Sequence, residues 1–150
     1  MTTDHDGLKH IYSKMDPDEV LELSKELIRI PSVYTKEKEL SDFICSKLAG
    51  WGLSPKQVEV EGHGPCVAAE IGDHDLPAVV FNGHMDTVDV MQGWRHDPFG
   101  ANIEDGMLYG LGSLDMKCGL ASLMLAFRTL ADSGLVKGFR VGFQAVTGEE

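Results

Sequence analysis

The sequence has few cysteines, and their arrangement excludes a small scaffold built on disulfides. Its three cysteines, Cys45, Cys66 and Cys118, are widely spaced and form no CxxC pair. An odd number of isolated thiols is typical of a reducing compartment. Residues 1–7 are polar and acidic, which is unlike a signal peptide, so a cytoplasmic location is the default expectation.

Basic residues are also scarce. The chain has 13 Lys and Arg against 24 Asp and Glu, a formal net charge of −11. This balance argues against nucleic acid and anionic membranes as partners, since both recruit basic surfaces. No apolar run is long enough to cross a bilayer. With 43% hydrophobic residues over 150 positions, the chain is predicted to be one globular domain or part of one.

Apolar periodicity and turn residues predict alternating helices and strands. A helix should begin at Asp16-Pro17, where Asp16 can cap and Glu19 completes a capping-box pattern, and should end near Ile30. The other expected elements are helices over 36–49 and 117–133, strands over 57–61, 66–71, 78–81 and 137–147, and a hairpin turning at Asp105-Gly106. The strand over 78–81 is apolar at every position, which predicts burial on both faces. We therefore expect an α/β layered fold with a partly parallel sheet.

Polar residues with metal-binding or acid–base capacity follow these buried segments. His84 and Asp86 come after the strand over 78–81, Asp115 precedes a helix, and Glu149-Glu150 follow the last strand. In α/β sheets, ligands bind beyond the carboxyl ends of the strands. The pattern therefore predicts a candidate site built from these five residues.

Each of these features also has an ordinary structural explanation. His84 and Asp86 fit a surface turn, and Asp115 fits a helix cap. An acidic pair such as Glu149-Glu150 is often just a solvated strand end. His63 is expected to be exposed, and His96 is a weaker candidate in a long loop near the site. Cys118 is expected to be a buried thiol at a helix start.

The residue types nevertheless suit metal-assisted hydrolysis. An imidazole that binds a metal needs its second nitrogen fixed, and a carboxylate such as Asp86 can do this. Neighbouring carboxylates point in different directions, so one member of the Glu149-Glu150 pair can bind a metal while the other acts as a general base.

Taken together, the motifs resemble the M20 family of metallopeptidases and deacylases, which includes acetylornithine deacetylase, succinyl-diaminopimelate desuccinylase and carboxypeptidase G2-like enzymes. The resemblance lies in residues 27–32, 83–88, 94, 98–99, 108–117 and 147–150. Two local departures are Leu111, where the family commonly has Arg, and Cys118, where it commonly has Gly; neither removes a ligand.

The resemblance implies a role for each candidate residue. His84 would bind one zinc ion and Asp86 would orient it, while Asp115 would bridge two zinc ions. Glu149 would be the general base and Glu150 a ligand of the second zinc. Co²⁺ is a possible substitute for the two Zn²⁺ ions.

The resemblance also implies a fold and a substrate class. The fold would be a three-layer zinc-peptidase-like catalytic domain, with a mixed sheet flanked by helices. The substrate would be an N-acyl amino acid or a short peptide, hydrolysed at an amide bond, and a homodimer is possible for a longer form. Residues 1–150 would be the N-terminal part of the catalytic domain, truncated before the lid or dimerisation domain and the remaining ligands, with an unpaired sheet edge. The alternative is a short, non-catalytic product that binds a metal or a partner.

Overall fold

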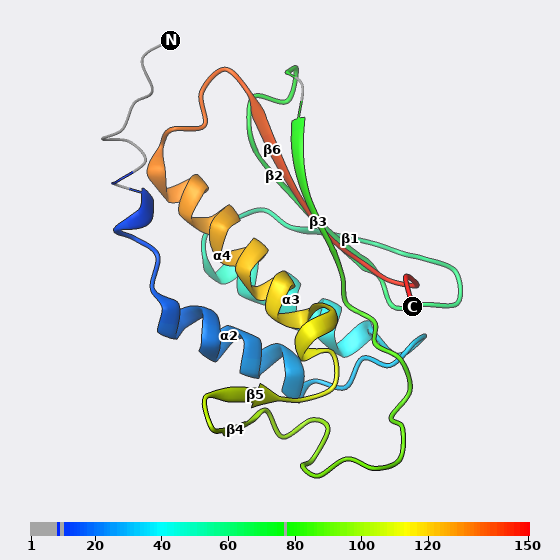
Figure 1. The fold of residues 1–150 in the computed structure, drawn as a ribbon. Coiled ribbons are helices and arrows are strands. Elements are labelled where there is room, and N and C mark those ends of the chain that lie inside the picture. Colours follow the sequence, from blue (N-terminus) through cyan, green and yellow to red (C-terminus); the bar gives the residue numbers. More distant parts are fainter. Residues whose placement is uncertain (1–8, 10, 77) are drawn as a thin grey trace.

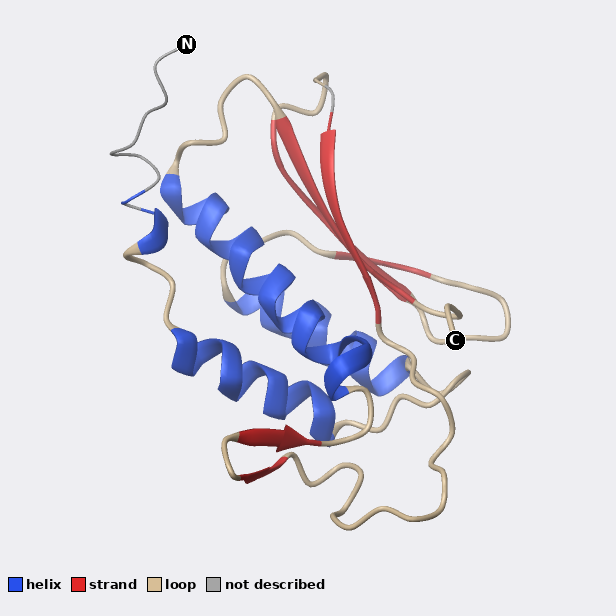
Figure 2. Cartoon of the chain, viewed as in Figure 1, coloured by secondary structure: helices blue, strands red, loops and turns tan. Residues whose placement is uncertain are grey.

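The computed structural model describes residue 9, residues 11–76 and residues 78–150; the expectation drawn from residues 1–7 lies outside this range. Figure 1 and Figure 2 show how the helices and strands of the described chain are arranged. The helices are α2 (Pro17–Arg29), α3 (Lys38–Gly50) and α4 (Cys118–Ser133). A kinked turn, η1 (Ser113–Lys117), in which Asp115 and Met116 have non-helical backbone angles, leads directly into α4. The strands are β1 (Lys56–Val58), β2 (Cys66–Gly72), β3 (Ala78–His84), β4 (Asn102–Glu104), β5 (Met107–Tyr109) and β6 (Arg140–Val146).

The main sheet has the strand order β1-β2-β6-β3. β2 pairs antiparallel with both β1 and β6, whereas β3 pairs parallel with β6. The expected mixed sheet with flanking helices is therefore confirmed. The register pairs Ala78 with Arg140 and His84 with Val146, so the carboxyl ends of β3 and β6 lie side by side.

Helix α2 begins where its sequence signals predicted. The side chain of Asp16 accepts a hydrogen bond from the backbone amide of Asp18, and Pro17 occupies the first turn. The prediction that Glu19 completes a capping box at Asp16 is wrong. The Glu19 carboxylate instead accepts two hydrogen bonds from Arg128 of α4, at 2.5 and 2.6 Å. A guanidinium on a neighbouring helix offers two charge-assisted bonds, which outweigh a single bond to a local amide.

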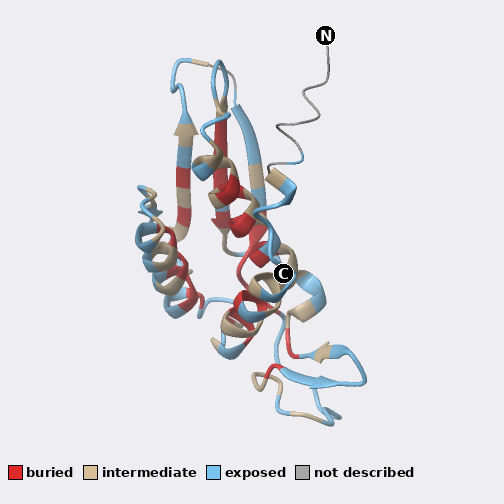
Figure 3. Ribbon diagram, turned by 90° about the vertical axis from the view of Figure 1, so that its left-hand side faces the viewer, coloured by how far each residue is buried: buried red, intermediate tan, exposed pale blue. Residues whose placement is uncertain are grey.

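The core lies between the sheet and the helices, which gather on one side of it (Figure 1). The apolar stripe of α4 faces inward as expected, and Phe127 packs against Phe143 of β6 with 5.7 Å between ring centroids. Each such buried side chain contributes roughly 1.5–3 kcal/mol to stability. Buried positions follow the inner surfaces of the helices and the centre of the sheet (Figure 3).

The expected burial of both faces of the strand over 78–81 is wrong. Val79 is 59% exposed and Val80 46% exposed, since β3 has β6 as its one neighbour among the described residues. A continuous apolar run is a sign of a central strand, but local sequence does not report how many neighbours a strand has. The expected unpaired edge of the sheet is present at β3.

The small hairpin is confirmed. β4 and β5 are joined by Asp105-Gly106, and both turn residues have positive φ, 50° and 75°. This conformation is the type I′ turn that an Asp-Gly pair favours. Across the described ranges, no helix is both long enough and apolar enough to span a membrane.

The Glu19–Arg128 ion pair gives a pH-dependent contribution to stability. The hydrogen bond from Arg128 is the main cause that holds the pKa of Glu19 below its ordinary value of 4.5. A lowered pKa stabilises the folded state above pH 4.5, and this contribution is lost as pH falls through the folded pKa.

We expect Glu19→Gln to remove about 1 kcal/mol or less near neutral pH, because the carboxylate is partly exposed. Urea unfolding at several pH values measures this difference. The gap in unfolding free energy between wild type and variant should shrink as pH is lowered from about 5 to about 3. A difference in unfolding free energy that stays constant over this range would contradict the pH-dependent contribution of the Glu19–Arg128 ion pair.

Candidate active site

The parallel pairing of β3 with β6 brings two distant segments of the chain together. The amide of Met85 donates to the carbonyl of Val146 at 2.8 Å, which extends the ladder one step beyond His84. His84 is 4% exposed. Residues 147–150 therefore leave the sheet directly beside the segment that carries His84 and Asp86.

Asp115 reaches the same place from η1. Its carboxylate Oδ1 lies 2.9 Å from Nε2 of His84, and neither η1 nor α4 has a side-chain N-cap hydrogen bond. The helix-cap interpretation of Asp115 is therefore wrong. Gly112 permits this approach, since it has φ +76° and an added Cβ would lie 2.6 Å from Cγ2 of Thr87.

The imidazole of His84 is held through its other nitrogen. Nδ1 donates to the backbone carbonyl of Asp86 at 2.9 Å, whereas the nearest carboxylate oxygen of Asp86 is 3.7 Å away. The turn interpretation of His84 and Asp86 as surface residues is wrong, because both are buried. Because Nδ1 is held by this carbonyl, Nε2 is the nitrogen that faces Asp115, where it can bind either a proton or a metal ion.

The carboxylate of Asp86 holds a different part of the site. Its Oδ2 accepts from the amides of Glu149 and Glu150, at 2.8 and 2.9 Å. Its Oδ1 is buried without a hydrogen-bond partner. Asp86 therefore fixes His84 through its backbone and the Glu149-Glu150 segment through its side chain.

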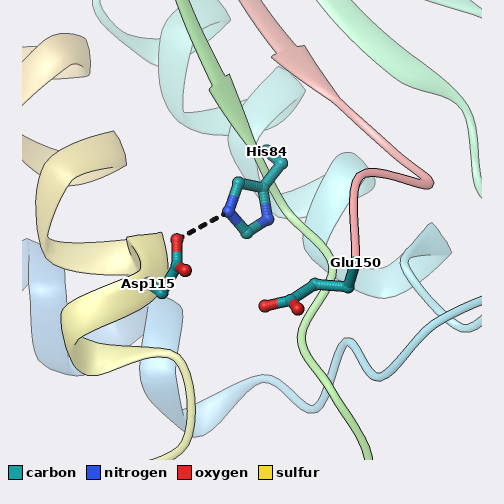
Figure 4. Close-up of side chains that lie close together, drawn as sticks. All are labelled: His84, Asp115 and Glu150. Atoms are coloured by element: carbon teal, nitrogen blue, oxygen red, sulfur yellow. Dashed lines mark hydrogen bonds and ion pairs between the residues drawn. The ribbon is translucent and has the colours of Figure 1, made fainter.

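Three side chains converge as a possible metal site. One ligand atom each from His84, Asp115 and Glu150 lies within 4.8 Å of the other two (Figure 4). Glu149 stays close, with Oε2 3.8 Å from Nε2 of His84. One imidazole nitrogen and two carboxylates are the nitrogen and oxygen donors that Zn²⁺ accepts, so the donor set fits this ion.

The cluster opens onto a shallow pocket of about 310 Å³. Asp115 and Glu150 line it, together with Thr87, Val88, Gly110, Gly112, Ser113 and Leu114. The histidine is thus buried and fixed, while the two carboxylates face a space that a small molecule can enter.

The surrounding charge changes the pKa of His84. Burial alone would lower this pKa, but the hydrogen bonds to Asp115 and to the Asp86 carbonyl, together with the charges of both carboxylates, raise it above the ordinary 6.5. The site therefore favours positive charge at this position, whether as a proton or as a cation.

Two parts of the surrounding structure had no clear signal in the sequence. Lys117 is fully buried, and its Nζ donates to the carbonyls of Leu27 and Ile30 at 3.0 and 2.8 Å. Burial lowers the pKa of Lys117 to about 8. Lys117 thereby fastens the Asp115 turn to the end of α2.

The second is a buried Glu37 that contacts His63. The expectation that His63 is exposed is wrong, since 17% of its side chain is accessible. His96 binds Glu104 of the hairpin at 3.0 Å and is not among the residues of the metal cluster. Cys118 is half-buried at the first position of α4.

The fold and the clustered donors define a candidate metallohydrolase. Residues 80–150, which contain all five candidate residues, match the model of peptidase family M20/M25/M40. The chain belongs to this family, whose members are hydrolases.

Known relatives agree with this assignment. The chain is 38% identical over 140 residues to a succinyl-diaminopimelate desuccinylase of Methylobacterium radiotolerans, covering 89% of this chain and 35% of the relative. The chain thus spans about a third of the length of the curated relatives it matches.

Solved structures share the fold. An M20 family metallo-carboxypeptidase from Sulfolobus solfataricus superposes with a TM-score of 0.75 and 26% identity, over 91% of this chain and 31% of that one. A dinuclear metal-binding M20 peptidase of Bacillus subtilis, YXEP, gives a TM-score of 0.59 at 18% identity, over 91% and 35% of the two chains. The second likeness is evidence of the fold alone.

The double contact of Asp86 predicts a specific defect. Asp86→Ala leaves the amides of Glu149 and Glu150 without their acceptor, so Glu150 is no longer held beside His84. We expect zinc affinity, measured by isothermal titration calorimetry, to fall about 10- to 100-fold. The matched control is Asp89→Ala, which removes an exposed carboxylate three residues further along. Equal losses in the two variants would mean that general charge matters and not this contact.

Proposed function

We propose that the chain carries part of the active site of a zinc-dependent hydrolase that cleaves amide bonds in N-acyl amino acids or short peptides. The observation that carries the proposal is the convergence of His84, Asp115 and Glu150, with Glu149 beside them. The similarity to a desuccinylase and to a metallo-carboxypeptidase supports both substrate classes.

In this proposal His84 and Asp115 would hold one metal ion, while Asp115 and Glu150 would hold a second. A carboxylate has two oxygens, so Asp115 could supply one to each ion. Zinc supplies Lewis acidity to the substrate carbonyl and lowers the pKa of water when it is bound. Co²⁺ accepts similar ligands and is the proposed spectroscopic substitute.

The other residues of the site handle protons and orientation. Glu149 takes a proton from the attacking water on its carboxylate and returns it to the departing amine nitrogen. Asp86 keeps His84 in the Nδ1-protonated form through its carbonyl. The same residue keeps Glu149 at a fixed place through the amide contact of 2.8 Å.

We further propose that residues 1–150 are the N-terminal part of a catalytic domain. Coverage of about a third of the relatives supports this. A structural zinc site usually has four protein ligands and a catalytic site about three per metal, so three donors shared between two ions favour weak binding. The expected dimer and the cytoplasmic location stay predictions.

Metal binding tests the donor cluster directly. We expect the 150-residue chain to bind Zn²⁺ or Co²⁺ weakly, and His84→Ala to abolish binding in a calorimetric or visible-absorption titration. The matched control is His74→Ala, since His74 is an exposed histidine in the turn after β2. If the His84 variant bound the metal ion as well as the wild type does, the cluster would not be the metal site.

The base assignment is tested by turnover. In a form of the protein that hydrolyses an N-acyl amino acid, Glu149→Gln should keep zinc and lose about 10²- to 10⁴-fold in kcat, because an amide cannot accept the proton. Loss of metal with an unchanged rate per bound zinc would assign Glu149 to binding. Zinc binding without turnover in every form of the protein would favour the alternative, a non-catalytic metal-binding product.

A further inference from the structure

A buried carboxylate ties together two loops next to the site. Glu37 is 0% exposed, yet its carboxylate accepts from the amides of Thr35 at 2.8 Å and Gly64 at 2.9 Å, and lies 3.4 Å from Nδ1 of His63. A carboxylate removed from water is costly unless its oxygens are satisfied, and these contacts satisfy both. Glu37 therefore joins the loop over 32–37 to the loop over 61–65.

The first of these loops is fastened to the His84 segment. The amide of Thr87 donates to the carbonyl of Ser32 at 2.9 Å, and the amide of Tyr34 donates back to Thr87 at 3.0 Å. The hydroxyl of Ser32 donates to the carbonyl of Met85 at 2.7 Å. The Glu37 end of the loop thus has a rigid connection to the residues on either side of Asp86.

The second loop is fastened to the segment that carries Glu149 and Glu150. Thr147 donates from its hydroxyl to the carbonyl of Gly64 at 3.2 Å. The ring of His63 packs directly on Gly148, where an added Cβ would lie 3.0 Å from Cε1. Tyr34 meets the same ring edge-on, with 4.8 Å between centroids.

We propose that the ring of His63, on a loop that Glu37 holds through the amide of Gly64, is a positioning group for the Glu149-Glu150 segment; the functional part of this inference rests on the function proposed above. Gly148 immediately precedes Glu149 and has φ +77°, which glycine adopts freely, so its own backbone preference does not fix the direction of the segment. Asp86 holds the two amides that follow. The His63 ring limits the segment at Gly148, so the two contacts together fix where the Glu149 and Glu150 side chains begin.

Two substitutions of His63 separate its ring contact with Gly148 from its polar contact with Glu37, and a third substitution changes Glu37 itself. His63→Phe keeps a flat ring against Gly148 but loses the nitrogen that faces Glu37. His63→Asn keeps a polar group near Glu37 but removes the ring. Glu37→Gln keeps the size of the side chain but replaces one carboxylate oxygen by an NH₂ group. One of the two backbone amides that donate to Glu37, from Thr35 and Gly64, then faces a donor and loses its acceptor.

A control variant separates positioning from general loss of stability. Ile44→Val shortens a fully buried side chain on α3, the helix that follows Glu37, and changes no residue of either loop. It lowers the stability of the same part of the fold and should leave the site unchanged.

The first readout is Co²⁺ affinity of the 150-residue chain, measured from visible absorption well below the unfolding temperature. His63→Asn and Glu37→Gln should weaken binding about tenfold, as expected when a partner that orients ligands is lost. His63→Phe and Ile44→Val should stay within about twofold of wild type, a difference too small to indicate a lost contact. Retained affinity in His63→Asn, or an equal loss in Ile44→Val, would overturn the proposal.

The second readout does not depend on metal. The backbone amide signals of Glu149 and Glu150 in ¹H–¹⁵N NMR spectra report their contact with Asp86. These signals should move in Glu37→Gln, which keeps the His63 ring, and stay near their wild-type positions in Ile44→Val; His63→Asn is left out of this readout because loss of an aromatic ring shifts nearby amide signals by itself. If the wild type binds no Co²⁺, the proposed function fails while the amide signals still decide the positioning role; unchanged signals in folded Glu37→Gln would overturn it.

Discussion

The site depends on the parallel pairing of β3 with β6. Their paired residues are 62 positions apart in the chain (140 − 78), yet the register sets His84 beside Val146. Parallel strands end at the same edge, so the residues that follow both strands meet there without any further folding. Asp115 then needs only the turn before α4 to join them. The common carboxyl end of β3 and β6, and not any single side chain, brings a histidine and several carboxylates together.

Charge is the second constraint on this edge. The carboxylates of Asp86, Asp115, Glu149 and Glu150 surround a single imidazole. Asp86 is fully buried and is stabilised by two amides, whereas the side chains of Asp115 and Glu149 are 74% and 61% exposed. Water screens the exposed groups, and the raised pKa of His84 reports the negative potential that remains. A cation placed among these groups would reduce their mutual repulsion, which links the geometry of the cluster to the proposed metal chemistry.

Features encoded by neighbouring residues were predictable from sequence. Asp16-Pro17 begins α2, and Asp105-Gly106 turns the hairpin, because each depends on the conformations of adjacent residues. The convergence of candidate ligands followed from a general rule about strand ends. Glu19 was misjudged because Arg128, its partner, lies 109 positions away.

The site features that sequence could not supply all depend on distant contacts. The carboxylate of Asp86 accepts from residues 63 and 64 positions away, and Lys117 donates to Leu27 across 90 positions. Glu37 looks like any other acidic residue before a helix until its three partners are seen. The prediction that β3 is buried on both faces was wrong for a related reason. The neighbours of a strand are set by the whole sheet and not by the strand's own apolar residues.

The exposed edge of β3 has a consequence for how the protein exchanges hydrogen with solvent. In a strand with a partner on one side, successive amides alternate between that partner and the open side. The amides of β3 that face β6 are held in the ladder, while those between them meet water directly. Exchange along Ala78–His84 is therefore expected to alternate between slow and fast from one residue to the next, whereas β6, paired on both sides, is protected throughout. The strand that carries His84 is thus expected to be protected at alternate amides along its length.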